Sequence, residues 1–328
     1  MTSGQRHLVT GANGQDGGYL VDRLLGEGHE VHAMCHDRLG GERIAREHPQ
    51  VIAHVMDLVD NAGIDALIAA VVPTHIYNLA GNTSVARSWE DPTGTADVLA
   101  LGPVRLLDAA WRQDSSGRPV RFLQASSAEV FGDTDEVPQT EDTPRRPVTP
   151  YGAAKSFAHE MAAIYRARGM HVSAAILYNH ESPRRPESFV ARKIAMGAVS
   201  IALGAQSELV LGNIDVHRDW GYAPDYVDAM IRIVGQPQGG DYVVATGESH
   251  SVREFAAEAF SYLGIADWET RVRIDPALYR PADPKALVGD SSRLRSIGWE
   301  PSVDFATLVH IMVDSELDRQ RVAGTQRK

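Results

Sequence analysis

Two side chains capable of acid–base chemistry, Tyr151 and Lys155, stand four residues apart at the start of an expected helix. Thr149 can cap that helix and Pro150 suits its first position, so the two side chains fall one turn apart on one face. A phenol normally titrates near ~10 and is a poor base at neutral pH. An ammonium group one turn away favours the phenolate, which can then take a proton from a hydroxyl group. The alternative for such a pair taken alone is a surface helix pair without chemistry.

Glu129 is a third titratable group, on the strand–loop that precedes this helix. A carboxylate enclosed against an apolar face titrates at a higher pH and can alternate between acid and base. The alternative is a solvated turn residue before Val130-Phe131-Gly132. With Tyr151 and Lys155, Glu129 forms a trio of titratable groups that predicts acid–base chemistry.

The elements that position these groups alternate between short apolar runs and helical patterns, which predicts a parallel sheet wrapped by helices. Expected strands cover 7–10, 30–35, 51–56, 75–79, 121–125 and 172–177, and expected helices cover 17–27, 62–71, 94–112 and 150–168. The predicted fold class is therefore α/β, a Rossmann-like doubly wound parallel sheet. Its ligand crevice is expected at the carboxyl ends of the strands.

A glycine-rich turn connects the first expected strand to the first expected helix. Glycines three apart allow a tight turn and close backbone approach to a pyrophosphate at the helix amino end. We therefore expect a dinucleotide here, although turns need glycine in any case. The turn residues expected to contact it are Gly11, Asn13, Gly14, Gln15, Asp16 and Gly17.

Asp37 follows the second expected strand, twenty positions beyond Gly17. A carboxylate there can accept hydrogen bonds from the adenosine ribose and repels a 2′-phosphate, which favours NAD. Arg38 is adjacent and could instead bind a 2′-phosphate, which would favour NADP. The alternative for both residues is a solvated loop pair. Asp57, after the third strand, is expected at the adenine.

The second half of the chain changes character after Leu177. Loops containing Pro and Arg lead to an expected helix at 191–203, short strands at 209–212 and 242–245, and helices at 252–263 and 303–317. We expect 1–177 to form the dinucleotide-binding domain, with segments near 213–248 contributing. Residues 178–328 are expected to form mainly a smaller, interleaved α/β substrate-binding domain.

Composition limits the possible partners. The 328 residues carry a formal net charge of −11, which disfavours nucleic acid and anionic membranes. Cys35 is the single cysteine and the 13 histidines show no ligand spacing, so no disulfide and no metal are expected. With no secretory leader and no apolar run long enough to span a bilayer, the expected compartment is the cytoplasm.

Longer motifs carry a more specific resemblance. General ones are Thr10–Gly17 (TGANGQDG), Tyr77–Ala80 (YNLA), Gln124–Gly132 (QASSAEVFG) and Tyr151–Lys155 (YGAAK). More specific ones are Asn179–Arg185 (NHESPRR), Phe189–Ile194 (FVARKI), Gly212–Gly221 (GNIDVHRDWG) and Ala245–Phe255 (ATGESHSVREF). Over nearly its whole length the sequence resembles the GDP-mannose 4,6-dehydratase family of extended short-chain dehydrogenases/reductases.

The resemblance implies roles for individual residues. The implied catalytic residues are Ser127, Glu129, Tyr151 and Lys155. The implied cofactor contacts are the residues of the glycine-rich turn together with Asp37, Arg38, Asp57, Leu58, Leu79, Ala80, Tyr151 and Lys155. The implied contacts with a GDP-sugar are Asn179, Glu181, Arg184, Val190, Lys193, Gly212, Arg218, Arg280 and Asp283. Arginine forks and an amide donor suit a pyrophosphate independently of the resemblance.

The implied reaction is an internal redox dehydration of GDP-mannose. Tyr151 takes the proton of the 4-hydroxyl, Glu129 removes the C5 hydrogen and helps the C6 hydroxyl leave as water, and hydride returns to C6. The cofactor is regenerated at each turnover. The family implies NADP, whereas Asp37 favours NAD.

Several departures from the family pattern leave alternatives open. Residues 145–149 and Pro186 differ, the segment His36–Gly41 lacks the family's paired Arg and Ser residues, and Ser127 replaces a Thr. A dehydratase for another GDP-sugar such as GDP-heptose, or a GDP-sugar C4 dehydrogenase or epimerase, is the nearest alternative. A non-catalytic cofactor-sensing protein is disfavoured because Tyr151, Lys155 and Glu129 are all present. The family implies at least a homodimer, built from the helices at 94–112 and 150–168, and a homotetramer is the other possibility.

Overall fold

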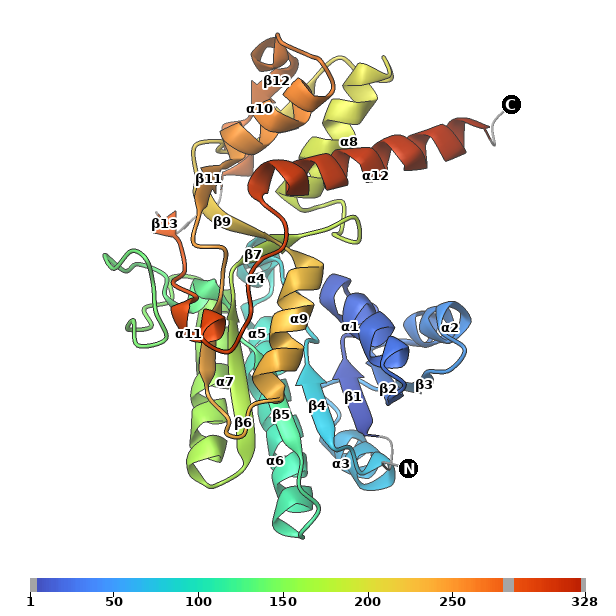
Figure 1. The fold of residues 1–328 in the computed structure, drawn as a ribbon, viewed down its shortest axis with the longest axis vertical. Helices are drawn as coiled ribbons and strands as arrows, with labels where there is room; N and C mark the ends of the chain where they lie inside the picture. Colours follow the sequence, from blue (N-terminus) through green and yellow to red (C-terminus); the bar gives the residue numbers. More distant parts are fainter. Residues whose placement is uncertain (1–4, 280–285, 326–328) are drawn as a thin grey trace.

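A seven-stranded sheet forms the centre of the larger part of the molecule (Figure 1). The computed structural model describes the backbone of residues 5–279 and 286–325. The strands are β1 (Arg6–Thr10), β2 (Glu30–Cys35), β3 (Ile52–Val55), β4 (His75–Asn78), β5 (Arg121–Ala125), β6 (His171–Leu177) and β10 (Asp241–Val244). They lie in the order β10-β6-β5-β4-β1-β2-β3 and every pairing is parallel. The predicted doubly wound α/β fold is confirmed.

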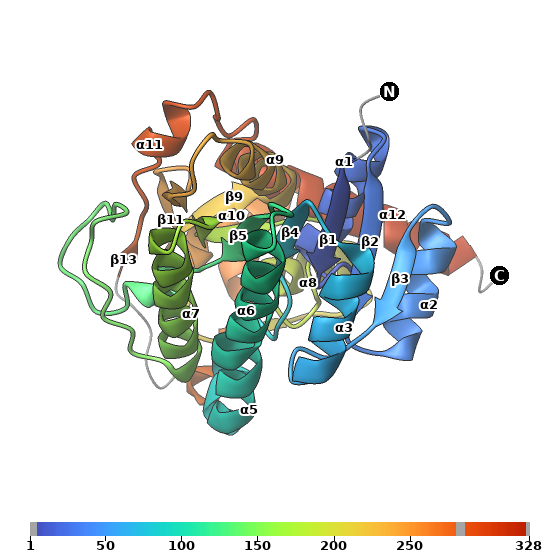
Figure 2. The ribbon, with the colours of Figure 1, turned by 90° about the horizontal axis from the view of Figure 1, so that it is seen from below.

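Helices cover both faces of this sheet (Figure 2). One face packs against α1 (Gln15–Gly26), α2 (Arg38–Glu47) and α9 (Ala223–Val234) through a core that includes Leu20, Ile44 and Met230. The other packs against α3 (Asn61–Val71), α6 (Gly102–Ser115) and α7 (Pro150–Ala167) through Leu67, Leu107 and Ala162, among others. With both faces buried, the strands other than the edge strand β3 are nearly continuous runs of buried residues, as is typical of parallel sheets.

The helical stretch expected at 94–112 has internal structure. The short helices α4 (Val85–Glu90) and α5 (Pro92–Ala96) precede a π-helical turn, Asp97–Leu101, which continues into α6. Arg105 fastens this turn by donating to the Asp97 carboxylate at 2.7 Å. The expected helix at 94–112 is confirmed as helical, but a π-helical turn interrupts the α-helical structure.

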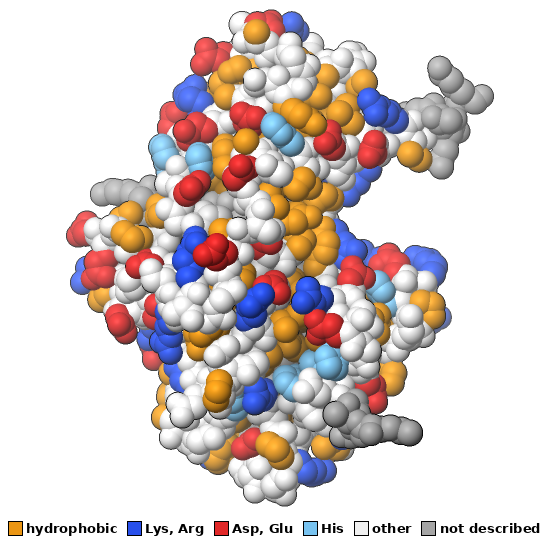
Figure 3. Space-filling model, viewed as in Figure 1, with side chains coloured by type: hydrophobic (Ala, Val, Ile, Leu, Met, Phe, Trp, Pro, Cys, Tyr) orange, Lys and Arg blue, Asp and Glu red, His pale blue; other side chains and the backbone are white. Residues whose placement is uncertain are grey.

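A smaller part with its own core lies beyond the carboxyl ends of the strands (Figure 1). Its helices are α8 (Val190–Ala202), α10 (Val252–Tyr262) and α12 (Phe305–Thr325), with short turns at Trp268–Arg271 and Pro276–Leu278. The short helix α11 (Ser292–Arg295) packs on β10, and its Leu294 belongs to the core of the large sheet. Its strands are β7 (Asn179–Glu181), β8 (Leu209–Leu211), β9 (His217–Tyr222), β11 (Ser249–Ser251), β12 (Val272–Ile274) and β13 (Ala286–Leu287). The surface is hollowed between the part that carries α8 and α12 and the part that carries α1 and α2 (Figure 3).

The chain crosses between the two parts more than once. β10 and α9 come late in the sequence, yet β10 pairs with β6 and α9 packs on α1. In contrast, β7 directly follows β6 but pairs with β9 of the smaller part. Residues from both halves of the sequence therefore meet at the junction. In the described parts of the chain, no helix is long and apolar enough to cross a membrane.

Candidate active site

Tyr151 and Lys155 lie in the first turns of α7, beside the end of β5. Thr149 caps α7 by accepting from the Gly152 N–H at 2.9 Å, and Pro150 opens the helix, as the sequence predicts. Both side chains are buried, so the pair is not an exposed helix pair. The Lys155 ammonium donates to the Ala125 carbonyl oxygen at 2.9 Å and lies 5.8 Å from the centre of the Tyr151 ring.

Ser127 and Glu129 complete this group from the turn after β5. The Ser127 hydroxyl is hydrogen-bonded to the Tyr151 phenol. Its Oγ also accepts from the Glu129 N–H at 3.2 Å. The Glu129 side chain is half-buried and its Oε2 is shielded from solvent, so this carboxyl group does not point into bulk water. The Ser127 hydroxyl and the Tyr151 phenol thus meet, and the charge of the Glu129 carboxyl acts on the phenol.

Burial dominates the electrostatics of the two α7 side chains. It raises the pKa of Tyr151 to about 12, while the Ser127 hydrogen bond opposes the rise, Glu129 adds to it and Arg185 opposes it. Burial also lowers the pKa of Lys155 to about 8, against the influence of Asp16. Desolvation is thus the largest influence on the pKa of Tyr151, and the Lys155 ammonium is directed at the Ala125 carbonyl. That Lys155 favours the phenolate stays a prediction.

The glycine turn has the shape that a pyrophosphate needs. Gly11 has φ +67°, and a Cβ there would lie 2.9 Å from the backbone of Leu79 and Ala80. A Cβ on Gly17 would lie 2.2 Å from the Gly11 carbonyl oxygen. Gly14 precedes α1 and provides no side-chain cap, so the amino end of the helix is left to other acceptors.

The side chains of Gln15 and Asp16 do not extend into this cradle but connect it to β7. Gln15 Nε2 donates to the His180 carbonyl oxygen at 3.0 Å, and Asp16 Oδ2 lies 2.9 Å from His180 Nε2. Burial raises the pKa of Asp16, but His180 and Arg185 outweigh it and hold the pKa below its usual value. The two parts of the molecule are therefore tied together beside the helix amino end.

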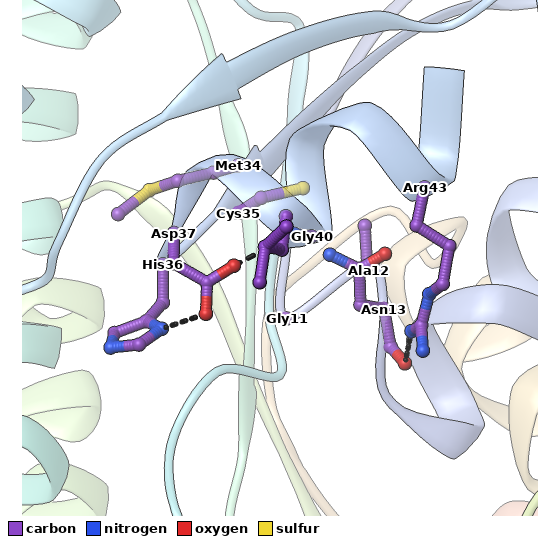
Figure 4. Close-up of a pocket in the computed structure, with 10 residues that line it drawn as sticks. Gly11, Ala12, Asn13, Met34, Cys35, His36, Asp37, Gly40 and Arg43 are labelled. Carbon is purple, nitrogen blue, oxygen red and sulfur yellow. Dashed lines mark hydrogen bonds and ion pairs between the residues drawn. The ribbon is translucent and has the colours of Figure 1, made fainter. Parts of the chain in front are cut away.

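A cavity of about 380 Å³ opens next to the glycine turn (Figure 4). Asp37 caps α2 at its wall, accepting from the Gly40 N–H at 2.7 Å and lying 3.1 Å from His36 Nδ1. The cavity lining consists of Gly11, Ala12, Asn13, Met34, Cys35, His36, Asp37, Leu39, Gly40 and Arg43. The placement is compatible with an adenosine site beside the turn, and Asp37 lies at the amino end of a helix rather than in a loop, which was the alternative.

Arg43, rather than Arg38, is the guanidinium at this cavity. Arg43 donates to the Asn13 carbonyl oxygen at 2.6 Å (Figure 4). Arg38 is 86% exposed and pairs with Glu42 along α2, outside the cavity lining. The cofactor contact expected of Arg38 stays a prediction, and without a ligand its side chain in the first turn of α2 is directed to solvent.

The remaining expected cofactor contacts lie near the turn but outside the cavity lining. Leu79 and Ala80 donate their backbone N–H groups to Thr10 Oγ1 at 3.1 and 3.0 Å and form the floor under Gly11. Asp57 turns its carboxylate to the Val59 N–H at 3.2 Å, and Leu58 is buried against Gly102.

The expected substrate contacts spread over the smaller part. Asn179 begins β7 opposite Trp220 of β9, Val190 begins α8 and Lys193 lies half-buried one turn later. Arg218 is buried on β9, and Gly212 faces the Leu278 carbonyl oxygen so closely that a Cβ would come within 2.9 Å. Arg280 and Asp283 lie outside the described residues.

Two expected contacts have other partners. Arg184 stacks on the Tyr19 ring at 4.1 Å and pairs with Asp22 at 2.7 Å, both on α1. The substrate contact expected of Arg184 stays a prediction, and without a ligand its guanidinium lies on the surface of α1. Glu181 is buried and its Oε2 lies 3.0 Å from Arg185 Nε, an ion pair whose angle does not suit a hydrogen bond. Arg145, in the divergent loop, is paired with Glu160 of α7.

His180, Arg185 and Arg43 are site residues that sequence reasoning did not identify. His180 is buried, with Nδ1 2.7 Å from the Tyr178 carbonyl oxygen and its ring stacked on Tyr226 at 4.5 Å. Burial lowers the pKa of His180, but Asp16 outweighs it and the net shift is upward. The motif NHESPRR contains His180 and Arg185 and was the sequence signal for these two residues, but it does not distinguish Arg184 from Arg185. Among the described residues, no cluster of His, Cys, Asp and Glu is arranged to hold a metal.

Comparisons with known proteins agree with this arrangement. The sequence model of the family described as GDP-mannose 4,6 dehydratase matches residues 8–312. GDP-mannose 4,6 dehydratase 2 of Arabidopsis thaliana is 44% identical over 324 residues, covering 95% of this chain and 86% of that protein. GDP-mannose 4,6-dehydratase of Sinorhizobium fredii is 38% identical over 354 residues and covers 100% of both.

Solved structures share the fold. UDP-glucose 4-epimerase of Thermus thermophilus in complex with NAD is 27% identical with a TM-score of 0.82, covering 95% of this chain and 99% of that one. RMD of Pseudomonas aeruginosa in complex with NADPH is 25% identical with a TM-score of 0.79, covering 96% and 100%. The near-complete family match, the similar relatives and the site at the end of β5 lead to one conclusion. The chain belongs to the GDP-mannose 4,6-dehydratase family.

Proposed function

We propose that this protein converts GDP-mannose to GDP-4-keto-6-deoxymannose, acting as a hydro-lyase with a tightly bound nicotinamide cofactor. The observation that carries the proposal is the shielded Glu129 carboxyl beside the Ser127–Tyr151 hydrogen bond. Oxidation of an alcohol needs only Tyr151, Lys155 and Ser127. Elimination of water needs a further acid–base group, and Glu129 is available at the same point.

The residues that would hold the cofactor fit it by shape. Gly11, Gly14 and Gly17 keep the turn bare for the pyrophosphate, and the cavity bounded by Asp37 and Arg43 has room for the adenosine. Lys155 would hold a ribose hydroxyl. When bound, the cofactor supplies an acceptor for the C4 hydride and donates a hydride to C6.

The protein's own residues carry the proton transfers. Tyr151 takes the proton of the 4-hydroxyl, and Ser127 donates a hydrogen bond to the oxygen as it becomes a ketone. The ketone makes the hydrogen at C5 acidic, and Glu129 removes it as a proton. Glu129 then returns a proton to the C6 hydroxyl, which leaves as water. C5 regains a proton when hydride returns to C6, and the proton that Tyr151 took from the 4-hydroxyl balances this step. The shielded position of the Glu129 carboxyl supports its double role, because desolvation favours the protonated form.

The substrate diphosphate is proposed to lie at the smaller part, against Arg218, Lys193 and Asn179. The buried guanidinium of Arg218 and the lysine on α8 supply donors for phosphate oxygens. Arg280, Asp283, Val190 and Gly212 remain proposals from the family resemblance.

For the coenzyme we propose NAD, although the family resemblance implies NADP. The Asp37 carboxylate lines the adenosine cavity and would repel a 2′-phosphate, and the Arg43 guanidinium is engaged by the Asn13 carbonyl (Figure 4). Mass spectrometry of coenzyme released from the purified protein tests this. A species without the 2′-phosphate is expected; recovery of NADP would refute the proposed preference.

The experiment that tests the function is incubation of the purified protein with GDP-mannose, followed by product mass. A product lighter by one water is expected. An epimerase product would have unchanged mass, and a C4 dehydrogenase would give a keto-sugar that retains its 6-hydroxyl. A parallel incubation with GDP-heptose tests whether the protein dehydrates a GDP-heptose rather than GDP-mannose.

Assembly as a homodimer is part of the proposal. Trp89, Leu101, Phe157 and Ile164 are exposed apolar side chains on α4, the π-helical turn and α7. Exposed apolar side chains that gather on neighbouring helices suit an interface. We propose that two copies meet through α6 and α7.

A further inference from the structure

A buried polar chain lies directly beneath the proposed active site. His159 follows Lys155 by one turn of α7 and is 0% exposed. Its Nδ1 lies 3.0 Å from the Ser126 hydroxyl, and its Nε2 lies 3.5 Å from Asp241 Oδ2. Arg166, two turns further along α7, grips both Asp241 oxygens at 2.9 Å. None of these four residues takes part in the proton transfers described above.

The end of β5 is fastened to α7 at three consecutive residues. The Ala125 carbonyl accepts from Lys155, the Ser126 hydroxyl contacts His159, and the Ser127 hydroxyl contacts Tyr151. Tyr151, Lys155 and His159 are spaced four residues apart, so they form one line along the helix. Ser126 is the middle attachment, between the carbonyl that orients the lysine and the hydroxyl that contacts the phenol.

Ser126 is also where the sheet stops holding β5. Its N–H donates to the Ala175 carbonyl of β6 at 2.8 Å, and the chain then enters the turn Ala128–Val130. Ser127 therefore has no sheet partner of its own among the described residues. Its position depends on the preceding residue and on the turn.

A fully buried imidazole is costly unless both sides of the ring are satisfied, and an apolar side chain would fill the same volume without that cost. Here Asp241, gripped by Arg166, lies 3.5 Å from Nε2 without completing a hydrogen bond, so the contact of Nδ1 with Ser126 is the hydrogen bond that this ring makes among the described residues. We propose that His159 is a positioning residue for the dehydration. Through Ser126 it holds the end of β5 so that Ser127 and the Ala125 carbonyl keep their places against Tyr151 and Lys155. The inference rests on the proposed function.

Variants that separate the two sides of the ring test this. His159→Asn keeps a polar atom near the Nδ1 position, and His159→Gln keeps one near Nε2. Ser126→Ala removes the contact at its other end, and His159→Leu removes both sides. Ser173→Ala is the matched control, because Ser173 is equally buried, accepts from the Gly240 N–H at 3.3 Å and lies away from the site.

Misplacement of a reacting group by a fraction of an ångström is expected to lower kcat about tenfold. We expect that loss in Ser126→Ala, His159→Gln and His159→Leu, with KM for GDP-mannose changed less than about twofold. His159→Asn should keep most of the wild-type kcat, and Ser173→Ala all of it. Equal kcat in Ser126→Ala and Ser173→Ala, or equal loss in His159→Asn and His159→Leu, would overturn the proposal.

Crystal structures give a readout that does not depend on turnover. In Ser126→Ala and His159→Leu, the Ser127 hydroxyl should lie beyond hydrogen-bonding distance of the Tyr151 phenol, whereas in Ser173→Ala the contact should persist. An intact contact in both variants refutes the positioning role. If wild-type protein fails to dehydrate GDP-mannose, the proposed function is wrong, and these structures still decide whether His159 positions β5.

Discussion

In the proposed mechanism, Glu129 is the residue that distinguishes dehydration from simple oxidation, because only the elimination step needs a base for the C5 proton. Its Oε2 is shielded from solvent, and its charge acts on the Tyr151 phenol. The position therefore serves a group that must meet substrate rather than water.

Replacing Glu129 with Gln keeps the shape of the side chain and removes its basicity. We expect C4 oxidation to continue and water loss to fall by at least about a hundredfold, the usual contribution of a positioned acid–base group. Absorbance of the reduced nicotinamide at single turnover should rise and persist, while product mass shows no loss of water. Normal dehydration by this variant would remove Glu129 from the mechanism, and Glu136→Gln, an exposed carboxyl in the following loop, is the control.

The pKa values of Tyr151 and Lys155 predict a pH profile. Burial raises the pKa of Tyr151 to about 12, so the phenolate fraction grows as pH rises. Burial lowers the pKa of Lys155 to about 8, so its ammonium is lost above that pH. If both charged forms are needed, kcat/KM should rise about tenfold per pH unit below about pH 8 and then flatten. A kcat/KM independent of pH from about 6 to 8 would contradict this pair of roles.

Sequence alone predicted residues whose role follows from their nearest neighbours. Thr149 and Pro150 define the start of α7, and the strand–turn–helix context defines the glycine turn. It could not choose between Arg184 and Arg185, because the choice depends on where α1 lies, far away in sequence. Nor could it find Arg43, which reaches the cavity only because α2 begins at Asp37.

At the scale of elements, the strands and most helices of the sheet were readable from their apolar periods. The helix α2 was not, because Gly40 and Gly41 near its start and its many charged residues conceal a single buried anchor, Ile44. The strand β9 was missed since its buried residues include Arg218 and Asp219, which a hydrophobic pattern does not register. Asp219 is satisfied by Thr246 and Gly247 from a distant segment.

The first residues of the sheet contain a buried cluster of histidines with consequences for stability. His7 on β1 stacks on His75 of β4 at 4.5 Å and meets His29 at 4.6 Å. Neither ring nitrogen of His7 has a hydrogen-bond partner among the described residues. Burial, with His75 and His29, lowers the pKa of His7 to about 3, and burial, with Arg121 and other histidines, lowers that of His75 to about 4.

These shifts make the fold acid-sensitive. Both pKa values lie below the unfolded value of 6.5, so the unfolded chain binds more protons as pH falls through that value. At pH 5 each histidine then costs about 2 kcal/mol of stability. His7→Phe keeps the ring stack and removes one titration, so its urea midpoint should fall less than that of wild type between pH 7 and pH 5. His217→Phe, at an exposed position of β9, should fall as wild type does; an identical fall in all three proteins would contradict the account.

At the scale of the whole molecule, the interleaved chain path is what assembles the site. β10 and α9 return to the sheet after β7 has entered the smaller part, and Gln15, Asp16 and His180 close the junction. Dividing the sequence at residue 177 into two domains captures this interleaved path only in part. The pairing of β7 with β9 depends on contacts between segments about forty residues apart, which local patterns do not encode.

Dimerisation through α6 and α7 gives a prediction at this scale. Ile164 is 51% exposed on α7, and a carboxylate there would be buried without a partner in a helix-to-helix interface. Ile164→Glu should lower the mass measured by light scattering from dimer to monomer. Leu203→Glu, 52% exposed at the end of α8, is the matched control and should leave the dimer intact. A dimer that survives Ile164→Glu unchanged would place the interface elsewhere.

The whole reaction is tested most directly with GDP-mannose that carries deuterium at C4. The account predicts a product one water lighter than the substrate, with the deuterium recovered at C6, because hydride leaves C4 and returns to the same molecule. A product of unchanged mass, or a dehydrated product from which the deuterium has been lost to solvent, would contradict it.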